Sequence, residues 1–308
     1  MGNWQDIFIF RCPCIAELNK IMIVLENNNS YGIRDPHPLV NNNYNPIKIE
    51  GKYTLYFNQR DVIDGRHRTC PRVATSHDFK TWRINENPVF IDGDYCSMGS
   101  VLLDDGEFYL YYSPDTKKGF KCIKMDDPYG FTSKKNEEFF LSINQFKGIS
   151  LMGLPFVSYI EDRYYCLFEG KTSSGFNIFM AESLDNQNWT PSNNGNPIYN
   201  YQHDFEIHGQ ANPSIYKIKN NFYLFYNGCR NGGWSINFGT SEGIMSKYQT
   251  NPKPLIRSKK GLKRVEGSRL IEIEGSYKIL YFISPTNDSF KNGKIYIESL
   301  NNDRLKTL

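Results

Sequence analysis

The sequence lacks any apolar run long enough to cross a membrane. Hydrophobic residues make up 39% and charged residues 22% of its 308 positions, and the mean hydropathy is −0.55, whereas a membrane-spanning helix needs roughly 20 consecutive apolar residues. The apolar residues 7–10 are soon followed by Arg11, Glu17 and Lys20, so no signal-peptide core develops there. We therefore expect a cytoplasmic protein with no membrane partner.

The sequence also has little net charge, because 36 basic side chains nearly balance 33 acidic ones and leave +3. Binding to nucleic acid usually requires lysines and arginines gathered along one face. The densest basic group, at residues 259–264, is typical of a solvated loop. The phosphate-binding pattern G-x-x-x-x-G-K-[ST] and the nucleophile elbow G-x-S-x-G are both missing. No nucleic-acid partner is expected.

Cysteine is neither abundant nor regularly spaced. The seven cysteines are an odd number, and Cys12 and Cys14 are too close for an ordinary disulfide. The others lie in or beside apolar stretches, where a buried reduced thiol is the expected state. Their scatter indicates a reducing compartment. Neither Cys nor His has the spacing typical of zinc ligands, so no metal site and no cofactor are predicted.

Aromatic residues, in contrast, are abundant: 21 Tyr, 21 Phe and 4 Trp, accompanied by 24 Gly and 15 Pro. Such a composition is typical of short strands joined by turns. A turn residue followed by four to six aromatic or aliphatic residues occurs five times. The copies start at residues 51, 106, 162, 220 and 275, so successive copies are 55 to 58 residues apart. This spacing indicates a repeat architecture.

The flanks of the repeat predict its fold. Each copy follows a short apolar strand through a turn such as Glu50-Gly51, which predicts an antiparallel hairpin, and two further strands follow. Four antiparallel strands repeated five times predict an all-β, five-bladed β-propeller, with a β-sandwich as the alternative. One domain, residues 1–308, is expected. The expected blades cover residues 41–90, 91–143, 144–199, 200–256 and 257–308. Residues 1–40 are expected to close the ring by adding an outer strand to blade 5, beside residues 294–299.

Two longer stretches carry a resemblance to a known family. Residues 76–90 and 183–199 both contain Ser-x-Asp, a Trp three or four residues after the Asp, and a loop that ends in Asn-Pro-aliphatic-aromatic. In these features the chain resembles the five-bladed propellers of glycoside hydrolase families 43 and 32, and their relatives among the mannoside phosphorylases. The resemblance implies a carbohydrate pocket at one end of the central channel, and allows a calcium or sodium ion in that channel.

The same resemblance implies two catalytic carboxyl groups, because glycoside hydrolysis uses one to protonate the leaving oxygen and one to activate water or attack. The family places its base in an Asp-Pro pair of blade 1 and its acid in a Glu-Gly-Pro of a later blade. The expected inner strand of blade 1 instead has Asn45-Pro46, and an amide cannot act as a base. Asp35-Pro36 matches nominally but lies ten residues earlier, where a turn is the alternative. Glu266-Gly267 of blade 5 keeps the Glu-Gly form.

Three acids are therefore predicted as the catalytic pool. Glu266 begins an inner strand, Glu169 ends the second strand of blade 3, and Glu206 lies in a loop rich in His and Asp before blade 4. The residues predicted to bind the sugar or an anionic substituent are Asn45, Arg60, His208, Asn212, Arg230 and Trp234. Arginine suits carboxylate or phosphate, and Trp234, like Tyr95, is suited to stacking on a sugar. Ion pairs and solvated loops are the alternative interpretation of these residues.

The predicted function is that of a carbohydrate-active enzyme that cleaves or transfers a glycosidic bond. Its partner is a small-molecule or oligosaccharide substrate, and the arginines suggest that this substrate bears an anionic group. A glycoside phosphorylase using inorganic phosphate is one alternative. A sugar-binding propeller without catalysis and a biosynthetic enzyme on the same scaffold are the others. The sugar, the linkage and the oligomeric state do not follow from the sequence.

Overall fold

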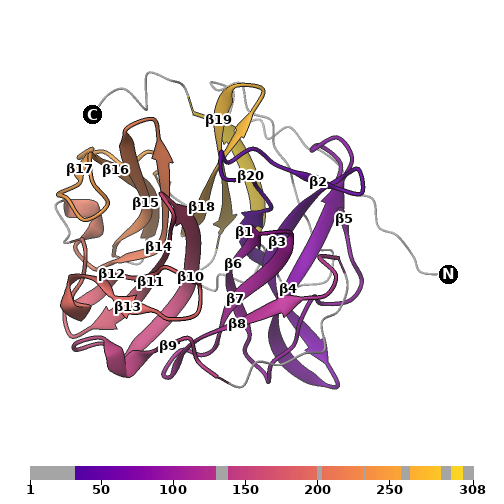
Figure 1. Cartoon of the computed structure of the whole chain (residues 1–308), viewed down its shortest axis with the longest axis horizontal. Helices are drawn as coiled ribbons and strands as arrows, with labels where there is room; N and C mark the ends of the chain where they lie inside the picture. The colour runs from indigo at the N-terminus through magenta and orange to yellow at the C-terminus, as the bar shows by residue number, and fades with distance from the viewer. Residues whose placement is uncertain are drawn as a thin grey trace.

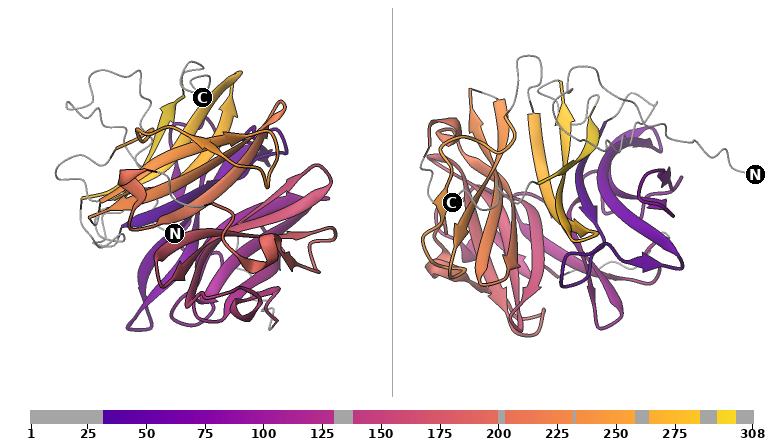
Figure 2. Two further views of the ribbon diagram at one scale, coloured as in Figure 1. Left: turned by 90° about the vertical axis from the view of Figure 1, so that its left-hand side faces the viewer. Right: turned by 90° about the horizontal axis from the view of Figure 1, so that it is seen from above.

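The computed structural model describes residues 32–129, 138–199, 203–231, 233–257, 264–285 and 293–300. Within these ranges the chain forms five antiparallel sheets arranged around a common centre (Figures 1 and 2). In Figure 1 the colours progress around the ring until the yellow strands of the last sheet lie next to the indigo strands of the first. The prediction of an all-β, five-bladed propeller is confirmed.

The blades follow one another in chain order, with the inner strand first. Blade 1 contains β1 (Ile33–Pro38), β2 (Lys48–Ile49), β3 (Lys52–Ile63), β4 (Arg66–Ser76) and β5 (Arg83–Ile84). Blade 2 contains β6 (Ser97–Asp104), β7 (Glu107–Asp115), β8 (Gly119–Met125) and β9 (Leu141–Ser142). Blade 3 contains β10 (Leu151–Ile160), β11 (Arg163–Thr172), β12 (Gly175–Ser183) and β13 (Thr190–Pro191).

Blade 4 contains β14 (Gln210–Ile218), β15 (Asn221–Arg230), β16 (Gly233–Ser241) and β17 (Gln249–Thr250). Blade 5 contains β18 (Arg264–Ile273), β19 (Ser276–Ser284) and β20 (Lys294–Ser299). The predicted N-terminal strand beside β20 falls outside the described residues. Helical turns in the described ranges are confined to η2 (Ile143–Gln145), η3 (Ser192–Gly195) and η4 (Asp204–Glu206), and none of them is long or apolar enough to span a membrane.

Blade 1 corrects the expected position of the inner strand. That strand is β1, which pairs with β3 through Arg34 opposite Asn58 and His37 opposite Tyr56. Blade 1 therefore starts before residue 41, and the Asp35-Pro36 pair belongs to its inner strand. The segment 39–47 forms a loop before the chain returns as β2 to pair with the start of β3. The prediction that Asn45 occupies the Asp-Pro position of blade 1 is wrong, because Asn45 lies in this loop.

A β-bulge interrupts every inner strand at an equivalent point. The strand register shifts between Arg34 and His37, Met98 and Ser100, Gly153 and Phe156, Ala211 and Ser214, and Glu266 and Arg269. A bulge bends its strand and redirects the side chain that it carries. Neighbouring bulges also touch, since a Cβ added to Gly267 would lie only 3.3 Å from the Cα of Asp35. The bulges thus form a crowded ring around the channel.

The Ser-x-Asp…Trp stretches belong to the scaffold. Asp78 accepts hydrogen bonds from the backbone of Lys80 and Thr81, both at 2.8 Å, and so holds a tight turn. The turn places Trp82 at 0% exposure, with its ring 5.0 Å from that of Phe79. Asp185 and the buried Trp189 repeat the arrangement in blade 3. These residues stabilise the blades through buried aromatic surface.

Candidate active site

Three carboxyl groups from three blades meet at the centre of the ring. Asp35 lies at the bulge of β1, Glu266 lies at the bulge of β18, and Glu169 lies near the end of β11. Glu169 stands opposite Gly153, where an added Cβ would lie 2.8 Å from its Oε1, so the glycine leaves room for the carboxyl group. Both glutamates interact electrostatically with Asp35, Arg34 and Arg264, and Glu266 also interacts with Glu169. We call Asp35, Glu169 and Glu266 the acidic cluster.

Asp35 is held from one side only. Its Oδ2 forms an ion pair with Arg34 Nε and accepts a hydrogen bond of 3.0 Å from Asn58 Nδ2. Asn58 in turn bonds both backbone groups of Met98, which couples Asp35 to blade 2. The second oxygen, Oδ1, is buried and has no hydrogen-bond partner. One oxygen of Asp35 is therefore positioned while the other remains available.

Glu266 lies in an environment that favours its protonated form. It is 4% exposed, and burial raises its pKa to about 7 even though Arg264 and Arg34 act in the opposite direction. Arg264 Nε lies 2.8 Å from Glu266 Oε1, a charge contact without hydrogen-bond geometry. Asn212 Nδ2 donates to Oε2 at 3.2 Å. Near neutral pH this carboxyl group can therefore carry a proton and deliver it.

Asn212 connects the two glutamates. Its side chain donates to Glu266, and its backbone N–H donates to Glu169 Oε2 at 3.0 Å. Its φ of 49° lies in the left-handed region, which asparagine tolerates better than most residues. Burial also raises the pKa of Glu169, with the Asn212 bond opposing the shift. The structure thus places Asn212 in the site, at 2% exposure, as a residue that positions the acids.

Two aromatic residues form the walls beside the cluster. Trp234 of β16 lies with its ring 5.8 Å from the guanidinium carbon of Arg264 and packs edge-on against Phe176. Tyr95 is 36% exposed and interacts with Arg34 and with the acidic cluster. Large, partly exposed rings beside polar groups are typical of sites that hold a sugar by one face.

Three other predicted residues have partners outside the acidic cluster: Glu206, Arg230 and His208. Glu206 has 0% exposure, and its Oε1 accepts 3.4 Å hydrogen bonds from Tyr199 and Tyr226 between blades 3 and 4. The exposed Arg230 lies 3.5 Å from Asp204. The exposed His208 accepts a hydrogen bond at Nδ1 from the backbone of Asn231. Arg60 sits in the β3–β4 hairpin opposite Thr69, which bridges to Tyr95.

Of the residues predicted from the sequence, the structure brings Glu169, Glu266, Asn212 and Trp234 together at or beside the acidic cluster. Asp35 and Arg34, which were not among the predicted site residues, lie there as well. The Asp35-Pro36 pair could have identified this inner strand. The loop at residues 39–47 separates it from the β2–β3 hairpin, so the pair was assigned to a position before the inner strand. Among the residues that the structure describes, no group of three or more His, Cys, Asp or Glu side chains is arranged to hold a metal ion.

Comparisons with known proteins bear on the fold of the chain. No family model matches the chain, and no curated protein matches it. A thermostable family-43 glycoside hydrolase is similar in structure, with a TM-score of 0.66, 16% identity and coverage of 90% of this chain and 92% of that one. An endo-1,4-beta-xylanase from Bacteroides thetaiotaomicron has a TM-score of 0.67, 20% identity and coverage of 89% and 92%.

An inulosucrase from Halalkalicoccus jeotgali, bound to kestose, has a TM-score of 0.66, 15% identity and coverage of 96% of this chain and 91% of that one. These likenesses span nearly the whole of each chain. The protein therefore has the five-bladed propeller fold of the glycoside hydrolases of this type.

Proposed function

We propose that the protein is a carbohydrate-active enzyme that cleaves or transfers a glycosidic bond at the acidic cluster. The observation that carries this proposal is the contrast between two carboxyl groups in one site. Burial raises the pKa of Glu266 to about 7, whereas Asp35 forms an ion pair with Arg34. Two acids whose environments differ in this way suit the two roles of glycoside chemistry. The similar structures are a glycoside hydrolase, a xylanase and an inulosucrase, which supports the same class.

Each acid takes one role in this proposal. Glu266 acts as the general acid and protonates the leaving oxygen. Asp35, through Oδ1, acts as the carboxylate that activates water or attacks the sugar. Glu169 lies near both, and its negative charge helps to keep Glu266 protonated. Glu206 has no part in this scheme, because it is enclosed by tyrosines between two blades.

We further propose that the substrate carries an anionic group, such as a uronate carboxylate or a phosphate. Asp35 has 0% exposure, and its Oδ2 forms an ion pair with the Arg34 side chain. A substrate anion would draw the Arg34 guanidinium away from Asp35 by offering it a second, bidentate partner. Arg264, stacked near Trp234, provides a second cation in the same site. Binding of an anionic sugar would thus release the catalytic carboxylate from its ion pair.

Glu266→Gln and Asp35→Asn test the assignment, assayed on a panel of neutral aryl glycosides and their uronide and phosphorylated counterparts. Each variant should lower kcat at least a hundredfold, because general acid–base groups contribute about 10²–10⁴. Glu182→Gln is the matched control, since Glu182 lies on β12 in an ion pair with Arg163. Wild-type levels of turnover in both cluster variants would rule out the proposed centre.

A pH profile separates the roles. The kcat/KM of the wild type should fall as the pH rises through about 7, where Glu266 loses its proton. Arg264→Met should move this limb to higher pH, because Arg264 opposes the raised pKa of Glu266. A limb that stays in place in the variant would exclude Glu266 as the acid.

The two arginines favour a glycoside phosphorylase as a second candidate. Arg34 and Arg264 both place guanidinium groups beside the acidic cluster, and phosphate would pair with them as well as a substrate carboxylate would. A phosphorylase needs inorganic phosphate as the attacking group and releases a sugar 1-phosphate. Product analysis with and without phosphate distinguishes the two reactions.

A further inference from the structure

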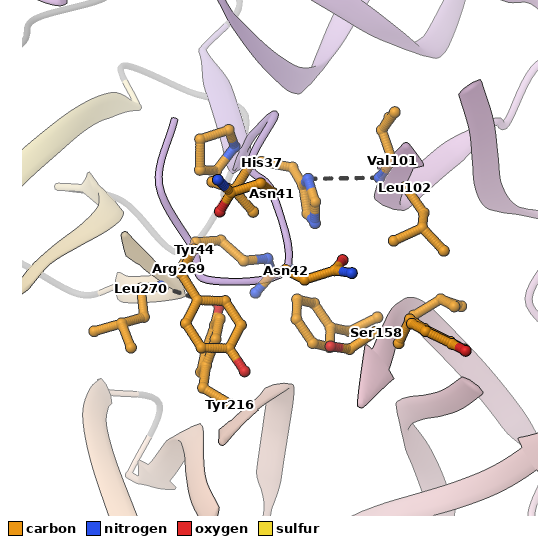
Figure 3. Close-up of a pocket in the computed structure, with 15 residues that line it drawn as sticks. His37, Asn41, Asn42, Tyr44, Val101, Leu102, Ser158, Tyr216, Arg269 and Leu270 are labelled. Atoms are coloured by element: carbon orange, nitrogen blue, oxygen red, sulfur yellow. Dashed lines mark hydrogen bonds between the residues drawn. The ribbon is translucent and has the colours of Figure 1, made fainter. Parts of the chain in front are cut away.

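We propose that the axial channel contains a binding site for one small monovalent anion, of the size of chloride, built around Arg269. On β1 and β18, the strand bulges separate this site from the acidic cluster. Arg269 follows Glu266 by three positions on β18, and His37 follows Asp35 by two on β1. A cavity of about 40 Å³ lies beside these residues and is bordered by all five blades (Figure 3).

Arg269 carries a charge whose compensation is incomplete. The residue is 2% exposed. Its Nη1 donates to the carbonyl of Ser268 at 2.8 Å, and its Nη2 donates to that of Gly99 at 3.2 Å. Its Nε is buried and has no hydrogen-bond partner. In the described part of the chain no carboxylate lies within ion-pair distance of this guanidinium, and such a buried charge is costly unless it is paired.

The cavity offers further hydrogen-bond donors to a ligand beside Arg269. His37 accepts at Nδ1 from the backbone of Val101, at 3.5 Å, which leaves Nε2 to carry the proton. Burial and the nearby Arg269 charge lower the pKa of His37, so its ring stays neutral. The hydroxyl of Tyr216 accepts from the backbone of Leu270 and shares a hydrogen bond with Ser214, and a hydroxyl group can donate as well as accept.

The floor of the cavity is a fixed part of the fold. The loop at residues 39–47 places Tyr44 there, where its hydroxyl accepts from the backbone of Lys217 at 2.7 Å and its carbonyl accepts from Glu272 at 2.9 Å. The volume of about 40 Å³ exceeds the roughly 10–15 Å³ that a single water requires. The cavity therefore has room for a small anion.

These residues do not fit the calcium or sodium ion that the resemblance allowed in the channel. The cavity lining contains Arg269 and His37, and no Asp or Glu. Hard cations need several carboxylate or carbonyl oxygens, and an unpaired guanidinium repels them. The sign of the charge at the axis therefore selects an anion.

Thermal unfolding in two sodium salts tests the proposal at constant ionic strength. One salt is chloride, and the other is isethionate, whose organic anion is much larger and should bind more weakly at Arg269. The Tm of the wild type should be higher in chloride by about 2 °C or more, the effect of a ligand that binds only the folded state. Arg269→Met should abolish the difference, whereas Arg83→Met, at an exposed position of β5, should keep it.

Bromide provides a second measurement that does not depend on a folded Arg269 variant. Crystals of the wild type grown in bromide should show an anomalous peak next to Arg269 Nε. The proposal is overturned if the wild-type Tm is the same in both salts and bromide does not occupy the cavity. In that case the two carbonyl hydrogen bonds, the Phe156 ring 5.0 Å from the guanidinium carbon and the charge of Asp35 would together compensate the buried charge.

Discussion

Glu266 should make the protein less stable as the pH rises, and the size of the effect can be worked out from the site. Its folded-state pKa of about 7 lies above the ordinary 4.5 of a glutamate. A group with a raised folded-state pKa contributes stability that is fully present below the unfolded pKa and is lost as the pH rises through the folded one. The contribution should therefore disappear between about pH 4.5 and pH 7. Each pKa unit corresponds to about 1.4 kcal/mol, so the loss is about 3 kcal/mol.

The assay is urea unfolding of the wild type and Glu266→Gln at pH 4, 5, 6, 7 and 8. The amide cannot ionise, so the free energy of unfolding of the variant should depend less on pH, and the two proteins should diverge by about 3 kcal/mol across the series. Glu182→Gln, outside the cluster, should follow the wild type. If Glu266→Gln loses stability with pH as steeply as the wild type does, burial does not raise the pKa of Glu266.

Three other substitutions probe the walls and the neighbours of the site. Trp234→Ala should raise KM roughly 5- to 30-fold with little change in kcat, because it removes about 1–2 kcal/mol of apolar contact with the substrate; an unchanged KM would exclude stacking on this ring. Gly153→Ala should lower kcat at least tenfold in a folded protein, checked by circular dichroism, because the new Cβ would lie 2.8 Å from Glu169 Oε1. Glu206→Ala should lower the free energy of unfolding by about 1–3 kcal/mol through lost buried hydrogen bonds and leave kcat/KM within a few-fold. A hundredfold loss of turnover at unchanged stability would restore Glu206 to the catalytic pool.

Blades 2 to 5 could be predicted because their hairpins are local. In each, a turn joins the inner strand directly to the second strand, as at Asp105-Gly106 between β6 and β7. Such turns and the alternation of side chains depend on residues a few positions apart. Glu266 and Asn212 were placed in the right strands for that reason. The inner strand of blade 1 was predicted wrongly because the loop at residues 39–47 separates that strand from the hairpin of the blade.

Glu206 shows the limit of reasoning from composition. His203, Asp204 and His208 around it resemble a cluster of titratable groups over a channel. In the structure η4 turns the carboxyl of Glu206 inward against Tyr199 and Tyr226, while Arg230 and His208 point to solvent-exposed partners. Density of charge along the chain does not reveal which side chains a short turn will bury.

By itself, the sequence determined the repeat, the strands and the turns of this protein, because these depend on interactions between near neighbours in the chain. The tertiary structure alone decided which acids meet. Asp35, Glu169 and Glu266 are about a hundred residues or more apart, and only closure of the ring brings them to one centre. The tertiary structure also decided the chemistry of the acids, since burial raises the pKa of Glu266. In the same way it left Arg269 buried without an ionic partner among the described residues. Both effects depend on which side chains the five packed blades bury beside one another.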